Sequence, residues 1–473
     1  MTHARLFIGG EWQRGVASFA VTDKFTGEPI ATVESASREQ VGAAVRAAAD
    51  AFARQRLAPH ARYDILQRAA GLVEARRDSF AATIVAESGF TVSDAAGEID
   101  RAVQTLLACA EEAKRIAGEM VPVDGAPGQE NRLAFTLRVP VGVVCAITPF
   151  NSPLNTVAHK VGPALAAGNT VVLKPATQTP LTATLLCQAL TDAGAPAGHV
   201  NLVHGSGAEA GQWLLEEPRV AFYTFTGSTG VGRHIQRTIG LRRSQLELGS
   251  ISSTIVCADA DLPRAIPRIV SASFRKAGQV CTSVQRLYVQ RPILDGLVSS
   301  LVAATAQARV GNPKEAATLV GPMISATEAA RAGEWVREAL GQGARLACGG
   351  RRDGALFQPT ILVDVAPRMR VMCDEIFAPV ISVVPYESLD AAIDDVNATP
   401  YGLAAGIFTT NVNTAMQAAR RLEVGTVHVN ETSSSRVDVM PYGGVKASGF
   451  GREGPRYAIH EMTEERLVTW SLY

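Results

Sequence analysis

The residues best suited to chemistry are a cysteine and a glutamate that lie far apart in the chain. Cys281 ends the segment Gly-Gln-Val-Cys and is followed by Thr282. These neighbours are small or polar, which favours a thiol nucleophile over the usual buried structural cysteine. Glu247 lies between two leucines, where burial would raise its pKa towards the range of a general base near neutral pH. A solvated glutamate at a strand edge is the plainer alternative for Glu247.

A third chemical group is Asn151 in the Pro-rich segment 148–153, Thr-Pro-Phe-Asn-Ser-Pro. An asparagine in such a position ordinarily forms a turn. Its side-chain amide could instead donate a hydrogen bond to a developing oxyanion, a contribution of roughly 3 kcal/mol to the barrier of acyl-transfer reactions. The residues alone leave both interpretations open.

Three segments could hold a dinucleotide phosphate or ribose. Two are Gly-rich turns between an expected strand and an expected helix, at 205–211 and 225–232, and the third is Lys174 at the end of a buried strand. A helix N-terminus after such a turn presents backbone N–H groups to phosphate. Neither turn has the GxGxxG spacing, so taken alone each is more simply a change of chain direction.

The elements that must position these residues alternate between strand and helix. Residues 36–118 predict amphipathic helices, and Ser37 with Gln40 predicts a capping box. From residue 139 onwards short apolar runs alternate with Ala-rich segments, which indicates βαβ units and parallel sheets. The expected strands are 141–147, 170–173, 200–203, 222–226, 287–289, 361–363 and 380–384, and the expected helices between them include 157–167 and 181–193.

Composition restricts the class of protein further. The 473 residues exceed one ordinary core, and 45 basic residues balance 45 acidic ones, so neither nucleic acid nor an anionic membrane is an expected partner. The N-terminal segment has no apolar signal core, and no apolar run reaches the length of a membrane span. Seven dispersed cysteines form no CxxC pair, so we expect no metal site, no disulfide framework and a cytoplasmic location.

Several motifs in order resemble the aldehyde dehydrogenase superfamily over nearly the whole chain, from Phe7-Ile8-Gly9-Gly10-Glu11-Trp12 to the segment 441–449. The resemblance implies that Cys281 attacks an aldehyde, that Asn151 and the Cys281 backbone N–H hold the oxyanion, and that Glu247 activates water. Hydride passes to a nicotinamide, and the thioacyl-enzyme is hydrolysed to a free acid. Members that transfer the acyl group to coenzyme A lack this glutamate.

The same resemblance assigns the cofactor site. Lys174 matches the family's adenosine-ribose lysine, Gly227 and Ser228 face the pyrophosphate, Glu375 binds the nicotinamide ribose, and Phe377 packs near the ring. Many NAD-preferring members carry Glu where this chain has Thr177, so NADP is admitted beside NAD, our first choice. The remaining expected cofactor residues are Thr148, Pro149, Phe150, Gly207, Gly211, Phe225 and Gly249.

The fold class implied is α/β, with a Rossmann-type cofactor domain, an α/β catalytic domain and a small β arm. Residues 1–118 and 139–247 are expected in the dinucleotide-binding domain and 248–455 in the catalytic domain. Residues 119–138 and 456–473 are expected to mediate assembly into a homodimer or homotetramer.

The substrate is expected to be a small aldehyde. The segments around Asn151 and 436–444 resemble the branch that contains lactaldehyde, glyceraldehyde, sulfoacetaldehyde and phosphonoacetaldehyde dehydrogenases. Val280 and Ser152 replace residues of the phosphonate-handling members, which disfavours a dianionic substrate. His159 stands where semialdehyde dehydrogenases carry arginine, which weakens the case for a semialdehyde. A small hydroxylated or neutral aldehyde is favoured. The alternatives are an aromatic aldehyde, a semialdehyde or a catalytically silent protein.

The expected pocket residues are Ser152, Asn155, His159, Val280, Thr282 and Arg436. An arginine such as Arg436 is more often solvated or structurally paired.

Overall fold

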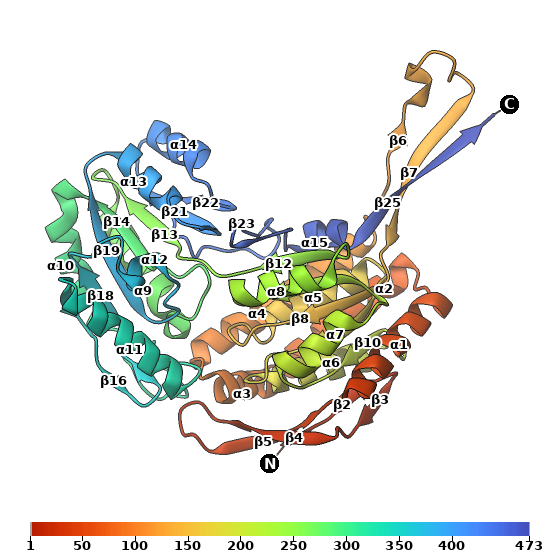
Figure 1. The fold of residues 1–473 in the computed structure, drawn as a ribbon, viewed down its shortest axis with the longest axis horizontal. Helices are drawn as coiled ribbons and strands as arrows, with labels where there is room; N and C mark the ends of the chain where they lie inside the picture. Colours follow the sequence, from red (N-terminus) through yellow and green to blue (C-terminus); the bar gives the residue numbers. More distant parts are fainter. Residues whose placement is uncertain (1, 473) are drawn as a thin grey trace.

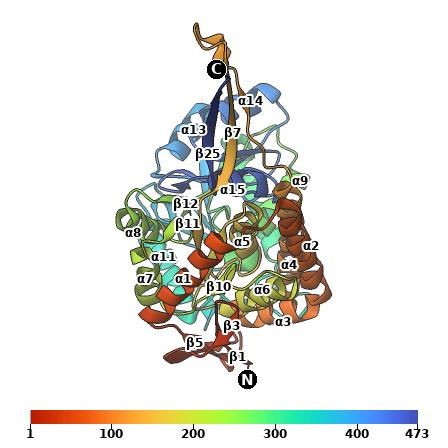
Figure 2. The same cartoon turned by 90° about the vertical axis from the view of Figure 1, so that its right-hand side faces the viewer.

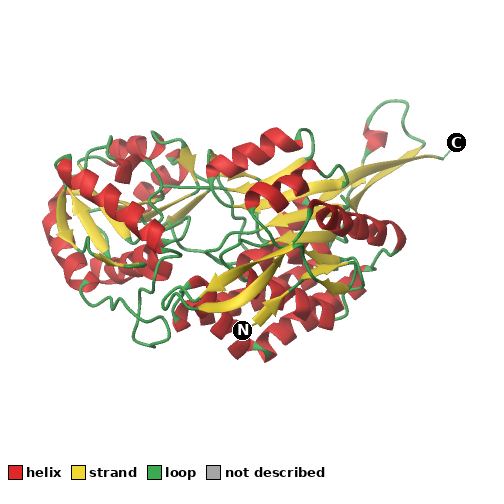
Figure 3. Cartoon of the chain, turned by 60° about the horizontal axis from the view of Figure 1, so that its bottom comes forward, coloured by secondary structure: helices red, strands yellow, loops and turns green. Residues whose placement is uncertain are grey.

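Two α/β bodies and a projecting β arm make up residues 2–472, which the computed structural model describes (Figure 1). An eight-stranded sheet has the order β24-β12-β11-β8-β9-β10-β2-β3, and a seven-stranded sheet has the order β15-β18-β19-β14-β13-β21-β22. Loops occupy much of the region between the two bodies (Figure 3). The α/β fold class expected from the sequence is confirmed.

The centre of the first sheet is parallel, because each buried Val/Ile-rich run is followed by a helix that returns the chain. Its strands are β8 (Val143–Ile147), β9 (Thr170–Lys174), β10 (Val200–Leu202), β11 (Val220–Thr226) and β12 (Arg243–Glu247). The intervening helices are α5 (Asn155–Ala166), α6 (Pro180–Asp192), η2 (Gly207–Gly211), α7 (Gln212–Glu216) and α8 (Thr229–Ile239). Antiparallel strands β2 (Leu6–Ile8), β3 (Glu11–Gln13) and β24 (Gly449–Phe450) extend the edges.

The predicted helical region is confirmed as α1 (Arg38–Arg54), α2 (Pro59–Ala75), α3 (Arg77–Ser88) and α4 (Val92–Ala113). Ser37 and Gln40 form the predicted capping box, with reciprocal N···O distances of 3.1 and 3.0 Å. The sequence did not predict the N-terminal sheet of β1 (Thr2–Ala4), β5 (Pro29–Ser35) and β4 (Ala17–Thr22).

The second sheet is also parallel except at β15 (Arg345–Cys348). Its other strands are β13 (Ser253–Val256), β14 (Arg286–Gln290), β18 (Thr360–Val363), β19 (Val380–Tyr386), β21 (Ala404–Phe408) and β22 (Thr426–Val429). The helices of this body are α9 (Leu262–Phe274), α10 (Leu294–Thr305), α11 (Ala326–Gly341), α12 (Arg370–Cys373), α13 (Leu389–Asn397) and α14 (Val412–Arg421). Short elements complete the chain: η1 (Val123–Gly125), η3 (Arg275–Gly278), η4 (Arg291–Ile293), β16 (Arg352–Asp353), β17 (Leu356–Phe357), β20 (Tyr401–Gly402) and β23 (Val445–Lys446).

The arm consists of β6 (Met120–Val121), β7 (Arg132–Pro140) and β25 (Thr463–Ser471), which extend away from both bodies (Figure 2). Its elements differ from the expected boundaries. Strand β7 runs past residue 138, and α15 (Pro455–Glu461) packs against α4 and α5 of the first body. Residues 449–450, expected in the catalytic domain, add a strand to the first sheet. Among residues 2–472 no helix is both long and apolar enough to span a membrane.

The arm exposes large apolar side chains that a monomer would leave in water: Met120, Leu133, Leu137, Leu467 and Trp470. We propose that this surface contacts a second copy of the chain, as the sequence resemblance implies. Replacing Leu467 and Trp470 with Asp should therefore lower the mass measured by light scattering to that of a smaller assembly. Replacement of the exposed Val412, which lies on α14 of the second body, serves as the control. An unchanged mass in the arm variant would contradict the proposal.

Candidate active site

The loop that carries Cys281 is held in a strained backbone conformation. Lys276 and Ala277 have φ values of 53°, and Gly278 has a φ of 69°. Left-handed conformations cost non-Gly residues about 1–3 kcal/mol each, so surrounding contacts must enforce them. A side chain at Gly278 would meet the Ala378 carbonyl oxygen at 2.2 Å, which explains the glycine there. The turn delivers Cys281 to a cavity of about 60 Å³ between the bodies.

The Cys281 thiol contacts the Tyr442 hydroxyl and is protonated at neutral pH. Its Sγ lies 3.0 Å from the Tyr442 hydroxyl, and the Arg436 guanidinium lies 3.8 Å from the Tyr442 ring centroid. Burial raises the pKa of Cys281 to about 11, although the Tyr442 hydroxyl and Arg436 act in the opposite direction. At neutral pH the thiol is therefore protonated until a base removes its proton.

Asn151 lines the same cavity and can donate to an oxyanion. Its Nδ2 donates to the Gln279 carbonyl at 2.9 Å, and its own carbonyl accepts from Lys276 Nζ at 3.2 Å. A carboxamide has two N–H donors, so the second is free for a ligand. The Cys281 backbone N–H donates no hydrogen bond within residues 2–472. The amide and this N–H form a pair of available donors beside the nucleophile.

Glu247, at the end of β12, lines the cavity as a buried acid whose pKa is raised. Its side chain is 3% exposed, and neither carboxyl oxygen has a partner within the described residues. Burial, reinforced by the nearby Glu453 carboxylate, raises the pKa of Glu247 well above its ordinary value. A group that titrates above its usual range can accept a proton from water or thiol once it ionises.

Glu98, which the sequence analysis did not select, joins the site loops. Its carboxylate accepts hydrogen bonds from Lys276 Nζ at 2.8 Å, Ser152 Oγ at 2.6 Å and the Asn155 backbone N–H at 2.9 Å. Burial acts to raise the pKa of Glu98, but Lys276 and these hydrogen bonds hold it at about 2. One carboxylate therefore ties the Asn151 loop and the Cys281 loop to α4. In the sequence, the one sign of this role of Glu98 is an acidic residue on the apolar face of a predicted helix.

His159 does not line the cavity, which corrects its assignment as a pocket residue. The imidazole is fully buried, and its Nε2 lies 2.8 Å from Asp438 Oδ1. Asp438 also accepts two hydrogen bonds from Arg101 and one from Asn155 Nδ2. Asn155 does line the cavity, but this network already engages its amide.

The other expected pocket residues, Ser152, Val280, Thr282 and Arg436, line the cavity. Arg436 is structurally paired, because it donates to Glu453 at 2.8 Å, and Glu453 also accepts from Lys160 at 3.0 Å. Ser152 is oriented by its hydrogen bond to Glu98. The sequence analysis did not select Arg101, Arg275 or Tyr442, which also line the cavity.

A wider cavity of about 430 Å³ shares several lining residues with the narrow one. Arg101, Arg275, Ser434 and Arg436 line both, so they stand where the two meet. The outer cavity therefore adjoins the narrow one at these four residues.

The expected cofactor residues gather at the carboxyl ends of the first sheet's parallel strands. The order β12-β11-β8-β9-β10 reverses between β11 and β8, the position where α/β sheets bind ligands. Lys174 at the end of β9 is buried without a carboxylate partner among residues 2–472, and burial lowers its pKa to about 8. Gly211 lies beside it, since a Cβ there would be 3.8 Å from Lys174 Cε.

The start of α8 offers the phosphate cradle. Ser228 is the N-cap of α8, and its Oγ accepts from the Val231 N–H at 3.4 Å. A Cβ on Gly227 would lie 2.4 Å from the buried Phe225 ring, so only glycine allows this close approach. The helix dipole and free N–H groups suit a pyrophosphate.

Glu375 belongs to the second body and lies beside Gly249 and Ser250, which follow β12. Its carboxylate accepts from the Ser250 N–H at 2.9 Å, a Cβ on Gly249 would lie 2.8 Å from Glu375 Oε2, and burial raises the pKa of Glu375 to about 7. Phe377 packs edge-on against Phe150, with ring centroids 5.9 Å apart.

The remaining expected cofactor residues follow strand ends. Thr148 and Pro149 continue from β8, where Thr148 donates its N–H to the Lys174 carbonyl at 3.2 Å. Thr177 after β9 is half-buried and Gly207 after β10 is exposed, and a Cβ added at Gly207 would meet no atom within 4 Å. A buried lysine, Gly-rich turns and a buried carboxyl group thus follow one another along the site. These groups fit the ribose and phosphate groups of a dinucleotide.

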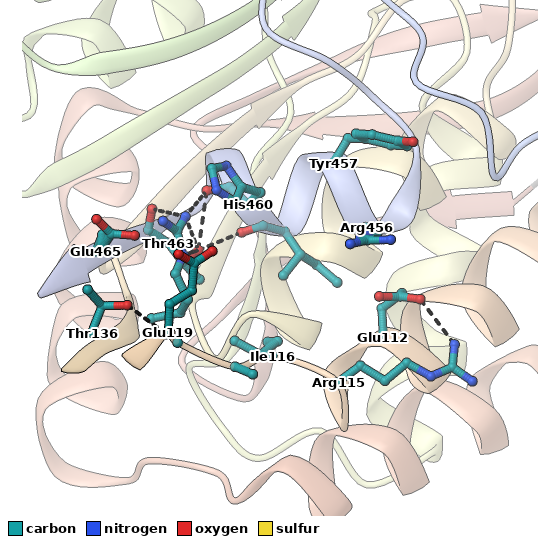
Figure 4. Close-up of a pocket in the computed structure, with 14 residues that line it drawn as sticks. Glu112, Arg115, Ile116, Glu119, Thr136, Arg456, Tyr457, His460, Thr463 and Glu465 are labelled. Atoms are coloured by element: carbon teal, nitrogen blue, oxygen red, sulfur yellow. Dashed lines mark hydrogen bonds and ion pairs between the residues drawn. The ribbon is translucent and has the colours of Figure 1, made fainter. Parts of the chain in front are cut away.

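A larger cavity of about 640 Å³ lies away from this chemistry, at the base of the arm (Figure 4). Its lining includes Glu119, Tyr457, His460 and Glu465, and it contains none of the expected site residues. Volume alone therefore does not locate the active site in this chain.

Comparison with known proteins gives one consistent result. The model of the aldehyde dehydrogenase family matches residues 12–468. A 3-sulfolactaldehyde dehydrogenase of Priestia aryabhattai is 49% identical over 467 residues, which cover 99% of this chain and 98% of the relative. A lactaldehyde dehydrogenase of Methanocaldococcus jannaschii is 37% identical and covers 98% of this chain and 99% of its own length. The structure of an NADP-dependent glyceraldehyde-3-phosphate dehydrogenase from Bacillus halodurans, complexed with NADP, has a TM-score of 0.97 at 36% identity and covers both chains fully.

The raised pKa of Cys281 can be measured by alkylation. Because only the thiolate reacts, the rate of iodoacetamide modification of cofactor-free protein at Cys281 should rise about tenfold per pH unit from pH 7 towards 10. Mass spectrometry of the Cys281 peptide separates it from the exposed Cys373. A rate that levels off below pH 8 would show that the thiolate is stabilised more strongly than burial allows.

Proposed function

The chain belongs to the aldehyde dehydrogenase family, a class of NAD(P)-dependent oxidoreductases, and on that premise we propose that it oxidises a small hydroxylated aldehyde to the free carboxylic acid. The observation that carries the proposal is that Cys281, Asn151 and Glu247 line one cavity of about 60 Å³. A nucleophile, an amide donor and a buried carboxyl group in contact with one space are the parts that acyl-enzyme chemistry requires.

The first step forms a bond between Cys281 Sγ and the aldehyde carbon. The thiol proton must leave for the sulfur to attack, and ionised Glu247 is the base that shares its cavity. The carbonyl oxygen becomes an oxyanion, which the free N–H of Asn151 Nδ2 and the Cys281 backbone N–H receive. One such donor contributes about 3 kcal/mol of transition-state stabilisation.

When bound, a nicotinamide would supply the acceptor for the hydride that leaves the thiohemiacetal carbon, and the carbon would be left as a thioester. Lys174, Gly227, Ser228 and Glu375 would hold the dinucleotide in the crevice at the carboxyl ends of the strands. Thr177 is neutral, whereas a glutamate at this position would repel the 2′-phosphate of NADP. The site therefore accepts both NAD and NADP.

Hydrolysis then releases the acid. Once the thiol proton has passed from Glu247 to solvent, Glu247 takes a proton from water, the hydroxide oxygen bonds to the acyl carbon, and the carbon–sulfur bond breaks to return the thiolate. Because burial raises the pKa of Glu247, the ionised base becomes more abundant as pH rises, and turnover should rise with it. A glutamate at this position favours hydrolysis over transfer to coenzyme A.

The cavity also bears on the size of the substrate. A cavity that binds benzene in a protein core measures roughly 150 Å³, whereas the space at Cys281 is about 60 Å³. This favours a three-carbon aldehyde over the aromatic alternative. The names of two relatives, lactaldehyde and 3-sulfolactaldehyde dehydrogenase, share a three-carbon 2-hydroxyaldehyde.

The test is NAD(P)H formation at 340 nm across an aldehyde panel with both cofactors. Cys281→Ala should abolish turnover, because no thiohemiacetal forms. Glu247→Gln should slow the burst of NAD(P)H and lose at least 100-fold in steady-state rate, because the same carboxylate deprotonates both the thiol and the hydrolytic water. Full steady-state turnover by either variant, or a requirement for coenzyme A, would overturn the mechanism.

A further inference from the structure

The Tyr442 hydroxyl makes the one side-chain hydrogen bond of the nucleophile. Within residues 2–472, the sulfur of Cys281 has a single hydrogen-bond partner, the Tyr442 hydroxyl at 3.0 Å. The hydroxyl in turn has no other partner in this part of the chain. Tyr442 is 7% exposed, so the contact is largely shielded from solvent. A hydroxyl group whose one partner is the reacting sulfur can serve that sulfur throughout the reaction.

The chemistry of the two groups sets the direction of this hydrogen bond during catalysis. A thiol is a weak donor and a thiolate has no proton to give, so only the phenol can donate once the sulfur is ionised. Burial, reinforced by the charge of Cys281, raises the pKa of Tyr442 well above its ordinary value, so the phenol keeps its proton. Burial also raises the pKa of Cys281, and the hydrogen bond from Tyr442 is the largest effect that opposes this rise.

Glu453 and Arg436 hold the phenol in place. Tyr442 and Glu453 exchange backbone hydrogen bonds, with N···O distances of 3.1 and 2.6 Å. The Arg436 guanidinium lies 3.8 Å from the Tyr442 ring centroid and donates to the Glu453 carboxylate at 2.8 Å. The positive charge against the ring acts to lower the pKa of Tyr442, which makes its O–H a stronger donor. The hydroxyl is therefore both fixed and polarised beside Cys281.

From this geometry we propose that the Tyr442 hydroxyl is a catalytic group, which donates a hydrogen bond to the Cys281 sulfur each time that sulfur bears negative charge. The inference rests on the proposed function, in which this happens twice. Before attack, ionised Glu247 takes the thiol proton and the hydroxyl stabilises the thiolate. At hydrolysis, the carbon–sulfur bond breaks with its electron pair on sulfur, and the same hydrogen bond stabilises the departing thiolate. Tyr442 keeps its own proton in both steps.

Alkylation of the full-length, cofactor-free enzyme tests the proposal without any aldehyde. Tyr442→Phe keeps the ring beside Arg436 and removes only the hydroxyl. Loss of a hydrogen bond to a charged group should raise the pKa of Cys281 by about one to two units. The thiolate fraction falls about tenfold per unit, and the greater nucleophilicity of a more basic thiolate recovers about threefold per unit. The rate of iodoacetamide modification at Cys281, measured at pH 8 by mass spectrometry, should therefore fall about 3- to 10-fold.

Tyr63→Phe is the matched control. The Tyr63 ring also lies beside a cation, with Lys114 Nζ 3.3 Å from its centroid, but it belongs to α2 and lines neither cavity near Cys281. This variant should be alkylated at the wild-type rate. As a second variant, 3-fluorotyrosine at position 442 keeps the hydroxyl and makes the phenol a stronger donor, so its alkylation rate should exceed that of wild type. Circular dichroism verifies that each variant is folded.

Turnover tests the catalytic role directly. With any aldehyde that wild type oxidises, Tyr442→Phe should lower both the burst rate and the steady-state rate of NAD(P)H formation about 3- to 10-fold, because the hydroxyl acts in both steps. Equal alkylation rates in wild type and Tyr442→Phe, or wild-type turnover in Tyr442→Phe, would overturn the inference and leave the proposed function standing. An equal fall in Tyr63→Phe would overturn it too. If wild type oxidises no aldehyde, the proposed function itself fails.

Discussion

The buried ion pair between Lys276 and Glu98 is the interaction on which the site depends. It joins the strained turn before Cys281 to α4, and Glu98 also holds the segment that follows Asn151. Removing one partner of a buried pair typically costs 3–5 kcal/mol, because an uncompensated charge remains. The left-handed backbone at Lys276 and Ala277 persists because this pair and the close packing of Gly278 enforce it.

Around this anchor, the acids of the site have different protonation states for identifiable reasons. Neighbouring cations lower the pKa of Glu98 and Glu453, whereas burial and the charge of Glu453 raise the pKa of Glu247, whose carboxyl oxygens have no hydrogen-bond partner among residues 2–472. Structural carboxylates are thus fixed as anions, and the carboxyl group that faces Cys281 can exchange a proton.

The sequence predicted the parallel α/β bodies, the helical block and the capping box, because these follow from local periodicity and caps. It also identified Cys281, Asn151 and Glu247, which the fold brings to one cavity. The sequence did not predict features that depend on contacts between residues far apart in the chain. His159 is an example, because only the fold reveals that Asp438 engages its ring. Arg101, Arg275 and Glu98 were missed for the same reason, since a charged residue on a helix or turn looks solvated until its surroundings are known.

The most direct test of this account is a double-mutant cycle on Glu98→Gln and Lys276→Met, with the free energy of unfolding and aldehyde turnover measured for every variant. Each single variant should lose about 3–5 kcal/mol of stability. The double variant should regain most of that stability yet remain at least tenfold below wild type in turnover, because the loops of Asn151 and Cys281 lose their common anchor. Wild-type turnover in the double variant would contradict the claim that this pair positions the site.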